Sequence, residues 1–354
     1  MNRTHLWRRR LAALLGVAAL AFAAACGGTT GDEAPAGSGG TASPDRPLVY
    51  GAFATPIEEP WDGVIHAALK EAADAGEITY EYVDNIGYAG GMERTLRDIA
   101  MNERPAIIFG DAFGNEAAVR NVAKDFPDIA FVFGSGEPPQ APNLAVFDNW
   151  IHDPAYLAGM LAAGMSKTGV LGVVGGFPVP EVNRIVNAFA AGAQSVNPQV
   201  QVKVSFINSW FDPAKAKQAA LAQVAQGADV LFAERAGVIE AAKERGLLSI
   251  GSLLDQKSQA PESVMTSLLW NMRPTVNAVV EQVKAGTFEG RDLREYSFMI
   301  NGGSDLAEIN TGVTGGIPED LIARVKAKEQ EIRSGQFVTP VDESTPAGSI
   351  EVQG

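Results

Sequence analysis

Short apolar runs alternate with stretches of helical periodicity from residue 48 almost to the end of the chain. The runs are rich in Val, Ile, Leu and Phe, which is typical of buried strands. We predict strands at 48–54, 78–83, 106–109, 129–133, 144–147, 170–174, 200–206, 230–232, 248–250, 263–269 and 296–300. We predict helices at 61–75, 92–101, 116–125, 154–165, 180–195, 213–226, 238–245, 274–285 and 319–334. Strands that alternate with helices in this way indicate βαβ units and parallel sheets.

The alternation of strands and helices starts again near Asp148, so we predict two doubly wound α/β domains. The C-terminal elements are too few for a third domain and must complete the other two. We therefore assign residues 47–149 and about 270–290 to domain I, and residues 150–269 and about 291–337 to domain II. Several crossovers then make a hinged clamshell, in which ligands bind beyond the carboxyl ends of the strands. Residues 338–354 are rich in Pro, Ser and Glu, and we predict a flexible tail there.

The N-terminal residues predict export and lipid attachment. Arg3 and Arg8 to Arg10 precede an apolar run at 11–25, which is shorter than a membrane-spanning helix needs and fits a signal peptide. Small residues precede Cys26, the only cysteine, as in a bacterial lipobox. We predict cleavage after residue 25, acylation of Cys26 and a disordered tether at 26–46, which places the protein outside the cytoplasm on the cell membrane. A plain signal peptide with an accidental cysteine is the alternative, and Sec and twin-arginine export both remain open.

Charge excludes some partners. The formal net charge is −14, and loss of residues 1–25 removes four arginines and no acids, which leaves about −18. Nucleic acids and anionic lipid surfaces reward clustered Lys and Arg, so neither is expected as a partner. With a single cysteine, neither domain can rely on a disulfide.

Catalytic signatures are weak. His66 and His152 have no neighbouring nucleophile, and no His, Cys and Asp cluster has metal-ligand spacing. We therefore expect no catalytic residue, no metal and no cofactor. A nucleoside hydrolase using the acids Glu58 and Glu59 is the enzymatic alternative.

Several segments resemble one family of solute-binding lipoproteins. They are residues 175–189 (beginning Gly-Gly-Phe-Pro-Val-Pro-Glu), 195–198 (Ser-Val-Asn-Pro), 208–213 (Asn-Ser-Trp-Phe-Asp-Pro), 269–274 (Leu-Trp-Asn-Met-Arg-Pro), 283–288 (Val-Lys-Ala-Gly-Thr-Phe) and 125–128 (Asp-Phe-Pro-Asp). Together they are similar to the basic membrane protein (BMP) family, whose members resemble bacterial purine nucleoside receptors. The resemblance covers most of residues 47–335. It implies a type I periplasmic-binding fold and a closing cleft that captures a purine, such as adenine, or a nucleoside for an ABC permease.

Aromatic residues after predicted strands are candidates to stack on a purine, whose two flat faces suit such contacts. They are Trp61, Phe113, Phe177, Trp210 and Trp270. A surface or helix-stapling position is the alternative for Trp61, and packing at a crossover is the alternative for Trp270. Phe211 adjoins Trp210, and one of the two is expected to pack between the domains.

Acids at strand ends are candidates for the polar edge of a purine or for ribose hydroxyls. They are Asp111, Glu234 and Asp255, and the family resemblance associates the position of Asp255 with ribose or base contact. Helix capping is the alternative for Asp111, whereas we assign Asp212 to capping outright.

The sequence thus predicts a monomeric, non-enzymatic binding protein whose partners are a small purine or nucleoside, ABC permease subunits and the membrane that holds its lipid anchor. A lipoprotein that reports ligand to a membrane receptor is the alternative, because the same clamshell would serve it. Base and nucleoside are not distinguished.

Overall fold

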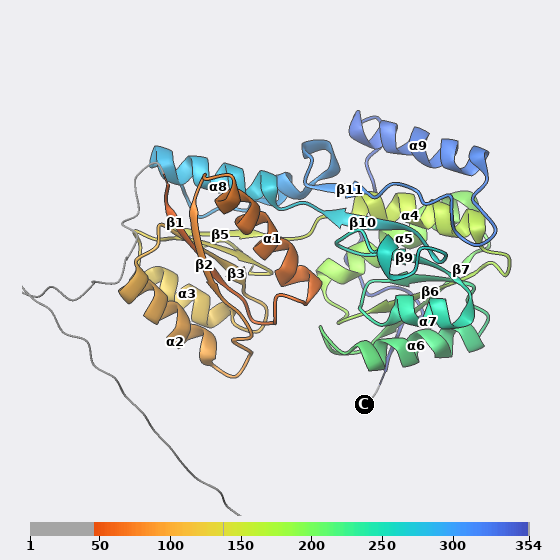
Figure 1. Ribbon diagram of the computed structural model, residues 1–354, viewed down its shortest axis with the longest axis horizontal. Helices are drawn as coiled ribbons and strands as arrows, with labels where there is room; N and C mark the ends of the chain where they lie inside the picture. The colour runs from red at the N-terminus through yellow and green to blue at the C-terminus, as the bar shows by residue number, and fades with distance from the viewer. Residues whose placement is uncertain (1–45, 137, 353–354) are drawn as a thin grey trace, which may run out of the picture. The chain divides into compact units, whose positions relative to one another are not determined.

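All named strands lie in two sheets in the computed structural model, which describes residues 46–136 and 138–352 (Figure 1). We call the part built on the first sheet lobe 1 and the part built on the second sheet lobe 2. The predicted pair of α/β domains with parallel sheets is confirmed.

Lobe 1 contains a five-stranded parallel sheet in the order β2-β1-β3-β4-β5. Its strands are β1 (Leu48–Ala52), β2 (Thr79–Val83), β3 (Ile107–Asp111), β4 (Ala130–Gly134) and β5 (Leu144–Phe147). Helices α1 (Pro60–Asp74) and α8 (Arg273–Ala285) cover one face (Figure 1). Helices α2 (Gly91–Asp98) and α3 (Glu116–Asp125) cover the other, and a π-helical turn, η1 (Ile99–Glu103), extends α2.

Lobe 2 contains a seven-stranded sheet in the order β11-β10-β9-β8-β6-β7-β12, in which only the β10–β11 pair is antiparallel. Its strands are β6 (Val170–Gly175), β7 (Gln201–Phe206), β8 (Val230–Ala233), β9 (Leu248–Gly251), β10 (Val264–Trp270), β11 (Ser304–Leu306) and β12 (Ile350–Glu351). Helices α4 (His152–Met165) and α5 (Pro180–Val196) pack on one face, and α6 (Pro213–Ala225) and α7 (Val238–Arg245) pack on the other. Helix α9 (Glu319–Arg333) lies on α4.

The continuous apolar strands are explained by burial on both faces. In β3, Ile107 and Phe109 belong to the core under α1, whereas Ile108 belongs to the core under α2 and α3. Side chains of a strand alternate between faces, so a strand covered twice must be apolar at every position. The same alternation separates Val173 from Val174 in β6.

Helices α4 and α5 approach each other closely through two glycines. A Cβ placed on Gly159 would lie 1.9 Å from the carbonyl oxygen of Phe189, and one placed on Gly192 would lie 1.9 Å from that of Tyr156. The helices can therefore touch backbone to backbone only because these positions lack side chains.

The chain crosses between the lobes three times. Residues 148–151 connect β5 to α4, residues 271–272 connect β10 to α8, and residues 286–303 return from α8 to β11. Two short 3-10 turns, η3 (Arg294–Ser297) and η4 (Met299–Asn301), occupy the third crossover. The predicted strand at 296–300 is therefore wrong: Phe298 instead packs edge-on against Trp150 and His152, which draws the segment away from any sheet.

The last segment differs from the expected flexible tail. Val352 N–H donates to the carbonyl oxygen of Phe206 at 2.7 Å, and β12 pairs with the edge strand β7. Asn183 and Asn187 of α5 also donate to backbone carbonyl oxygens of residues 342–344. Composition alone does not reveal such hydrogen bonds, because the partner groups lie far away in the sequence.

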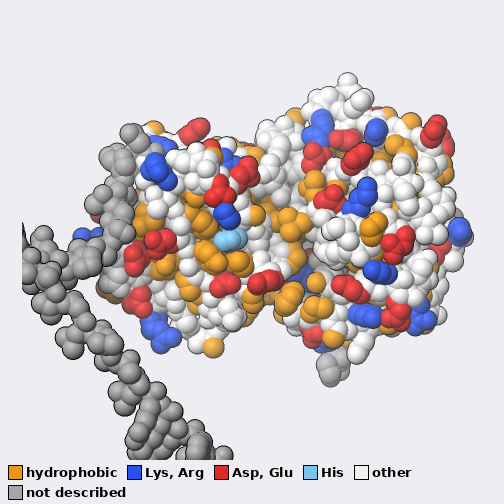
Figure 2. Space-filling model, in the orientation of Figure 1, with side chains coloured by type: hydrophobic (Ala, Val, Ile, Leu, Met, Phe, Trp, Pro, Cys, Tyr) orange, Lys and Arg blue, Asp and Glu red, His pale blue; other side chains and the backbone are white. Residues whose placement is uncertain are grey.

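Acidic and basic side chains are interspersed on the face shown in Figure 2, rather than gathered by sign. Among the described residues, no helix combines the length and the apolar character needed to cross a membrane.

Candidate ligand-binding site

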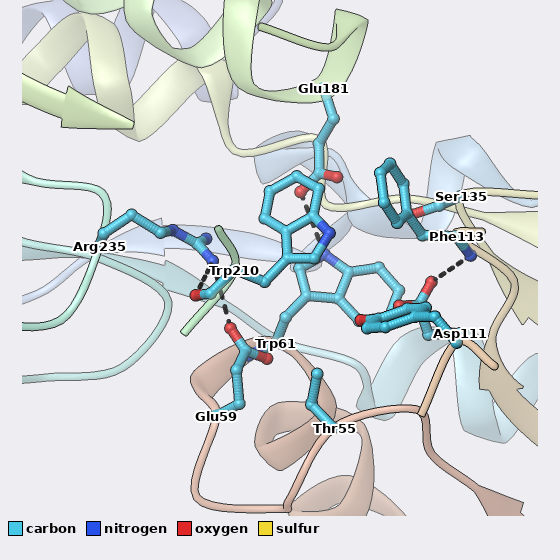
Figure 3. Close-up of a pocket in the computed structure, with 10 residues that line it drawn as sticks. Thr55, Glu59, Trp61, Asp111, Phe113, Ser135, Glu181, Trp210 and Arg235 are labelled. Atoms are coloured by element: carbon cyan, nitrogen blue, oxygen red, sulfur yellow. Dashed lines mark hydrogen bonds and ion pairs between the residues drawn. The ribbon is translucent and has the colours of Figure 1, made fainter. Parts of the chain in front are cut away.

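The carboxyl ends of strands from both lobes meet around a small cavity of about 20 Å³ (Figure 3). Lobe 1 contributes the segments that follow β1, β2, β3 and β4, and lobe 2 contributes those that follow β6, β7 and β8. The lining residues are Thr55, Glu59, Trp61, Tyr88, Asp111, Phe113, Ser135, Glu181, Trp210 and Arg235. This is the place that open parallel sheets offer to ligands.

Three aromatic side chains form a cluster across the lobe boundary, which we call the aromatic cluster. Phe113 of lobe 1 lies with its ring centroid 4.9 Å from Trp210 and 5.8 Å from Phe177, both of lobe 2. The Phe177 and Trp210 centroids are 4.8 Å apart. Rings at these distances attract one another beyond their burial, and the same surfaces can hold a flat heterocycle.

Trp61 forms the floor beside this cluster. Its ring is stacked on Phe147 at 5.8 Å and tilted against Trp270 at 5.0 Å. Its indole N–H donates to Glu181 Oε1 at 3.1 Å, which links the first helix of lobe 1 to α5 of lobe 2. Gly134 permits this position, because a Cβ there would lie 1.9 Å from the Trp61 ring.

A buried ion cluster of Glu59, Arg235 and Glu234 also joins the lobes. Glu59 caps α1 by accepting the N–H groups of Trp61 and Asp62, and its other oxygen lies 3.3 Å from Arg235 Nη1. Arg235 donates to both oxygens of Glu234, at 2.5 and 2.9 Å. Burial disfavours the guanidinium charge, but the two carboxylates outweigh burial and raise the pKa of Arg235. Arg235 therefore carries its charge at neutral pH.

Further buried acids surround the cavity. Burial raises the pKa of Glu181 to about 8, and the nearby Asp148 charge adds to this while Arg184 opposes it. Burial and the charge of Glu59 raise the pKa of Asp62 to about 7. Burial likewise raises the pKa of Asp111, although this carboxylate accepts the N–H of Phe113 at 2.9 Å. The site therefore holds more carboxyl groups than Arg235, the guanidinium that lines it, can neutralise.

The excess of buried carboxyl groups predicts that the stability of the protein depends on pH. The pKa of Glu181 rises from about 4.5 to about 8 on burial, so the folded, closed state holds a proton that the unfolded chain releases. Stability should be full below about pH 4.5 and decline as pH rises toward 8. Opening of the lobes can rehydrate the Glu181 carboxyl group and so reduce the effect. We therefore expect the free energy of unfolding to fall by roughly 1–2 kcal/mol over this pH range.

Thermal unfolding at pH 5 and pH 8 measures this effect. Glu181→Gln should flatten the decline, whereas Glu319→Gln, at an exposed position of α9, should retain it. An equal slope in both variants would show that Glu181 does not hold the proton.

The structure brings most of the predicted site residues together. Trp61, Asp111, Phe113 and Trp210 line the cavity, and Phe177 completes the aromatic cluster. Asp111 does not cap α3, whose N-terminal flanking residue is Asn115.

Three predicted residues are placed differently from these. Glu234 is buried behind the cavity, where it accepts from Arg235 and from the N–H of Gly176. Trp270 packs under Trp61, and its N–H lies 3.3 Å from Ser297 Oγ. Asp255 is exposed and accepts the N–H of Lys257, so the structure does not bring it to the cluster.

Three further residues named in the sequence analysis are Asp212, Phe211 and Cys26. Asp212 caps α6 through Lys215 N–H, as expected. Phe211 is exposed, so Trp210 is the one of the pair that lies at the lobe boundary. Cys26 lies outside the described residues.

Sequence reasoning missed Glu59, Glu181 and Arg235 as members of the site. Glu59 precedes Pro60 at the start of a predicted helix, which is a capping signal. Glu181 lies in segment 175–189, where the Phe and Pro residues are the more evident signal for a ligand wall. Arg235 follows a strand directly, as Glu234 does, but a basic side chain has no evident role toward a neutral purine.

Comparison with known proteins gives a consistent family match. Residues 57–296 match the model of the Bmp family, described as ABC transporter substrate-binding protein PnrA-like. A purine-binding protein of Brucella abortus is 31% identical over 274 residues, which cover 76% of each chain. A protein of Haloferax volcanii that is named as a putative ABC transporter glucose-binding protein is 30% identical to this chain. The match covers 63% of this chain and 58% of the Haloferax protein.

Solved structures agree on the fold. An ABC transporter solute-binding protein from Aeropyrum pernix superposes with a TM-score of 0.70 at 21% identity, covering 83% of this chain and 94% of that one. The predicted type I periplasmic-binding fold is therefore confirmed.

Proposed function

The chain belongs to the Bmp family of PnrA-like ABC transporter substrate-binding proteins, and from this premise we propose that it captures a purine base or nucleoside between its lobes for an ABC permease. The observation that carries the proposal is the aromatic cluster of Phe113, Phe177 and Trp210 at the lobe boundary. Polar groups for the purine edge adjoin it. Asp111 supplies a carboxyl group, and Trp210 Nε1 has no acceptor among the described residues, so it can serve a ring nitrogen or carbonyl oxygen.

Ligand entry requires the lobes to separate. The cavity of about 20 Å³ has room for roughly one water, whereas sites for small organic ligands measure about 300 Å³ or more. A ligand that touches both lobes favours a closed state by its greater affinity for that state. Capture followed by closure is therefore the mechanism that the contacts between the lobes support.

Stacking predicts the effect of two substitutions. Trp210→Ala and Phe177→Ala should each weaken purine binding by roughly 1–3 kcal/mol, because each removes one stacking face. Asp255→Ala is the matched control, since Asp255 is exposed outside the aromatic cluster. Isothermal titration with adenine, guanine, adenosine and guanosine measures all three.

Unchanged affinity in both aromatic variants would identify these rings as packing residues only. Glucose belongs in the same panel because of the Haloferax relative. Binding of glucose without any purine would favour a sugar importer instead.

A hydrolytic role receives no support from the acids Glu58 and Glu59. Glu59 uses one oxygen for the helix N-terminus and the other for Arg235, while Glu58 is exposed. We expect no ribose release from inosine. A role in signalling to a receptor needs the same clamshell, and genes for a permease and an ATPase beside this one would favour import.

We further propose an extracytoplasmic protein attached to the cell membrane through acylated Cys26. Small residues before this cysteine and the apolar run at 11–25 support the proposal. Wild type should partition with membranes and incorporate labelled fatty acid, whereas Cys26→Ala should be released or left unprocessed. Identical fractionation and labelling of the two proteins would contradict lipid attachment.

A further inference from the structure

A second cavity lies among the crossovers and the last residues of the chain, and we call it the hinge pocket. Its volume is about 250 Å³, and among the described residues it shares no lining residue with the cavity between the lobes. Apolar cavities of roughly 150 Å³ already hold a benzene-sized molecule. The hinge pocket is therefore large enough for a molecule built on one aromatic ring.

Two of the three crossovers form walls of the hinge pocket. Trp150 comes from the first crossover, and Phe298 and Ile300 come from the third. Ile332 near the end of α9 and residues between 335 and 341 close the remaining side. Lobes rotate about such crossovers through changes in a few backbone dihedral angles. The shape of the hinge pocket must therefore depend on how far the lobes are closed.

Most of the wall is apolar, and so is the entrance. Trp150 and Phe298 meet edge to face with their ring centroids 5.8 Å apart, and Phe337 adds another aromatic ring. Exposed lining residues are Ile300, Val338 and Val341, at 56%, 81% and 49% exposure. Large apolar side chains that gather on a surface are typical of binding sites.

Two buried polar atoms in the lining residues lack a hydrogen-bond partner. They are Trp150 Nε1 and Thr339 Oγ1, and no described residue pairs with either. Trp150 is 6% exposed and Thr339 is 1% exposed, so bulk water does not compensate them. Buried polar groups are nearly always paired, and an unpaired one is costly. A carbonyl or hydroxyl group of a bound molecule would supply the missing acceptor.

The aromatic rings of the pocket are not available to an organic cation. The guanidinium groups of Arg184 and Arg294 lie 4.0 and 4.9 Å from the ring centroid of Trp150. Lys328 Nζ lies 4.2 Å from the ring centroid of Phe337. Rings that already bind cations in this way would place a further cation beside like charge.

An anion is disfavoured as well. Each of those three cations also contacts a carboxylate, so they offer no excess positive charge. Asp153 and His152 line the pocket too. Burial lowers the pKa of His152, although Asp153 opposes this shift, so the imidazole is neutral at pH 7. The pocket therefore suits an uncharged molecule.

We propose that the hinge pocket binds a small uncharged molecule with one aromatic ring and one hydrogen-bonding group, and that this molecule favours the closed state of the lobes. The ring packs among the apolar walls, and the polar group pairs with Trp150 Nε1 or Thr339 Oγ1. The pocket has its shape while the lobes are in contact, so a molecule that fits it binds the closed state more tightly than the open one.

Isothermal titration of the full chain with phenol and benzamide tests the ligand class. Both probes are uncharged and carry one hydrogen-bonding group, whereas benzoate and benzylammonium are charged molecules of similar size. Phenol and benzamide should bind at least about tenfold more tightly, because burial of an unpaired charge is costly. Equal affinity for all four, or no binding of the uncharged probes, would overturn the proposal.

Thr339→Val locates the site. Valine has the shape of threonine without the hydroxyl group, so benzamide should bind roughly 2- to 10-fold more weakly, the effect of one lost hydrogen bond. Thermal unfolding should show no loss of stability, since the deleted hydroxyl group has no partner among the described residues. Thr275→Val is the matched control and should leave the affinity for benzamide unchanged. Thr275 Oγ1 is also buried and unpaired, but this residue belongs to α8 and does not line the pocket.

Trp210→Ala separates the hinge pocket from the cavity between the lobes. Trp210 lines only the cavity, so its loss should change the affinity for benzamide by less than about twofold. Weaker binding to Trp210→Ala together with unchanged binding to Thr339→Val would place benzamide in the cavity and overturn the second site.

The effect on closure is measured with adenosine. Saturating benzamide should tighten adenosine binding about fivefold or more, and adenosine should tighten benzamide binding by the same factor. Unchanged or weaker adenosine binding would overturn the effect on closure. This measurement alone rests on the proposed function: binding of benzamide without binding of any purine would contradict that function and leave the hinge pocket standing.

Discussion

Replacement of Arg235 by alanine is expected to lower the free energy of unfolding by about 3–5 kcal/mol, as removal of one partner from a buried ion pair does. Arg235 is 5% exposed and is the guanidinium between Glu59 and Glu234. Without it, two carboxylates face each other in a buried site. Glu59 would also lose its contact with lobe 2, so we expect the lobes to separate more readily.

Denaturant unfolding at pH 8 measures the loss, and solution scattering measures the separation. The loss should shrink at pH 5, because burial raises the pKa of Glu59 and protonation of this group removes the repulsion between the two carboxylates. Arg235→Lys should fall between wild type and alanine, since an ammonium keeps the charge but not the forked hydrogen bonds. Arg245→Ala is the control, because its side chain is 53% exposed beside Glu244 and should change stability by less than about 1 kcal/mol. A loss below that size for Arg235→Ala would mean that the cluster does not hold the lobes.

Gly192→Val is expected to be similarly severe, with a loss of about 3 kcal/mol, the upper end of the range for overpacking. A Cβ atom introduced at position 192 would lie 1.9 Å from the carbonyl oxygen of Tyr156. The backbone, rather than a flexible side chain, would therefore have to move. Helix α5 carries Glu181 and Arg184, so its displacement should also weaken nucleoside binding.

Denaturant unfolding and titration with adenosine measure both consequences. Gln194→Val tests the valine itself, because Gln194 is exposed two positions later in the same helix. Gln194→Val should lower the free energy of unfolding by roughly 0.5 kcal/mol, through the lower helix propensity of valine alone. Comparable losses in the two variants would show that the α4–α5 contact tolerates a side chain.

The repeating pattern of strands and helices was predictable because both faces of each sheet are covered, which leaves a strong apolar signal. The rule that ligands bind at carboxyl ends of strands located Asp111, Phe113, Phe177 and Trp210 at the lobe boundary.

Other positions depend on partners distant in sequence. Asp255 also follows a strand, but its carboxylate turns back to Lys257 N–H, as Asp often does in tight turns. Glu181 enters the site because Trp61, 120 positions earlier, donates to it. Residues 342–344 are held by Asn183 and Asn187, whose role becomes evident only once α5 and the C-terminal segment are neighbours. Composition and periodicity carry no information on such pairs.

The three crossovers also determine when each lobe can be completed during synthesis. All strands of lobe 1 have emerged by residue 147, yet α8 begins only at Arg273, after β10 of lobe 2. Arg273 then reaches back across 196 positions to Glu77, with Nη2 within 3.0 Å of both carboxylate oxygens. Until then the α1 side of lobe 1 lacks Val276 and Val279, which are fully buried in its core. Contacts between residues so far apart in the sequence require a long loop to close, which costs entropy and slows folding. The nascent chain thus presents an unfinished apolar face on lobe 1 while the part of lobe 2 from α4 to β10 is synthesised.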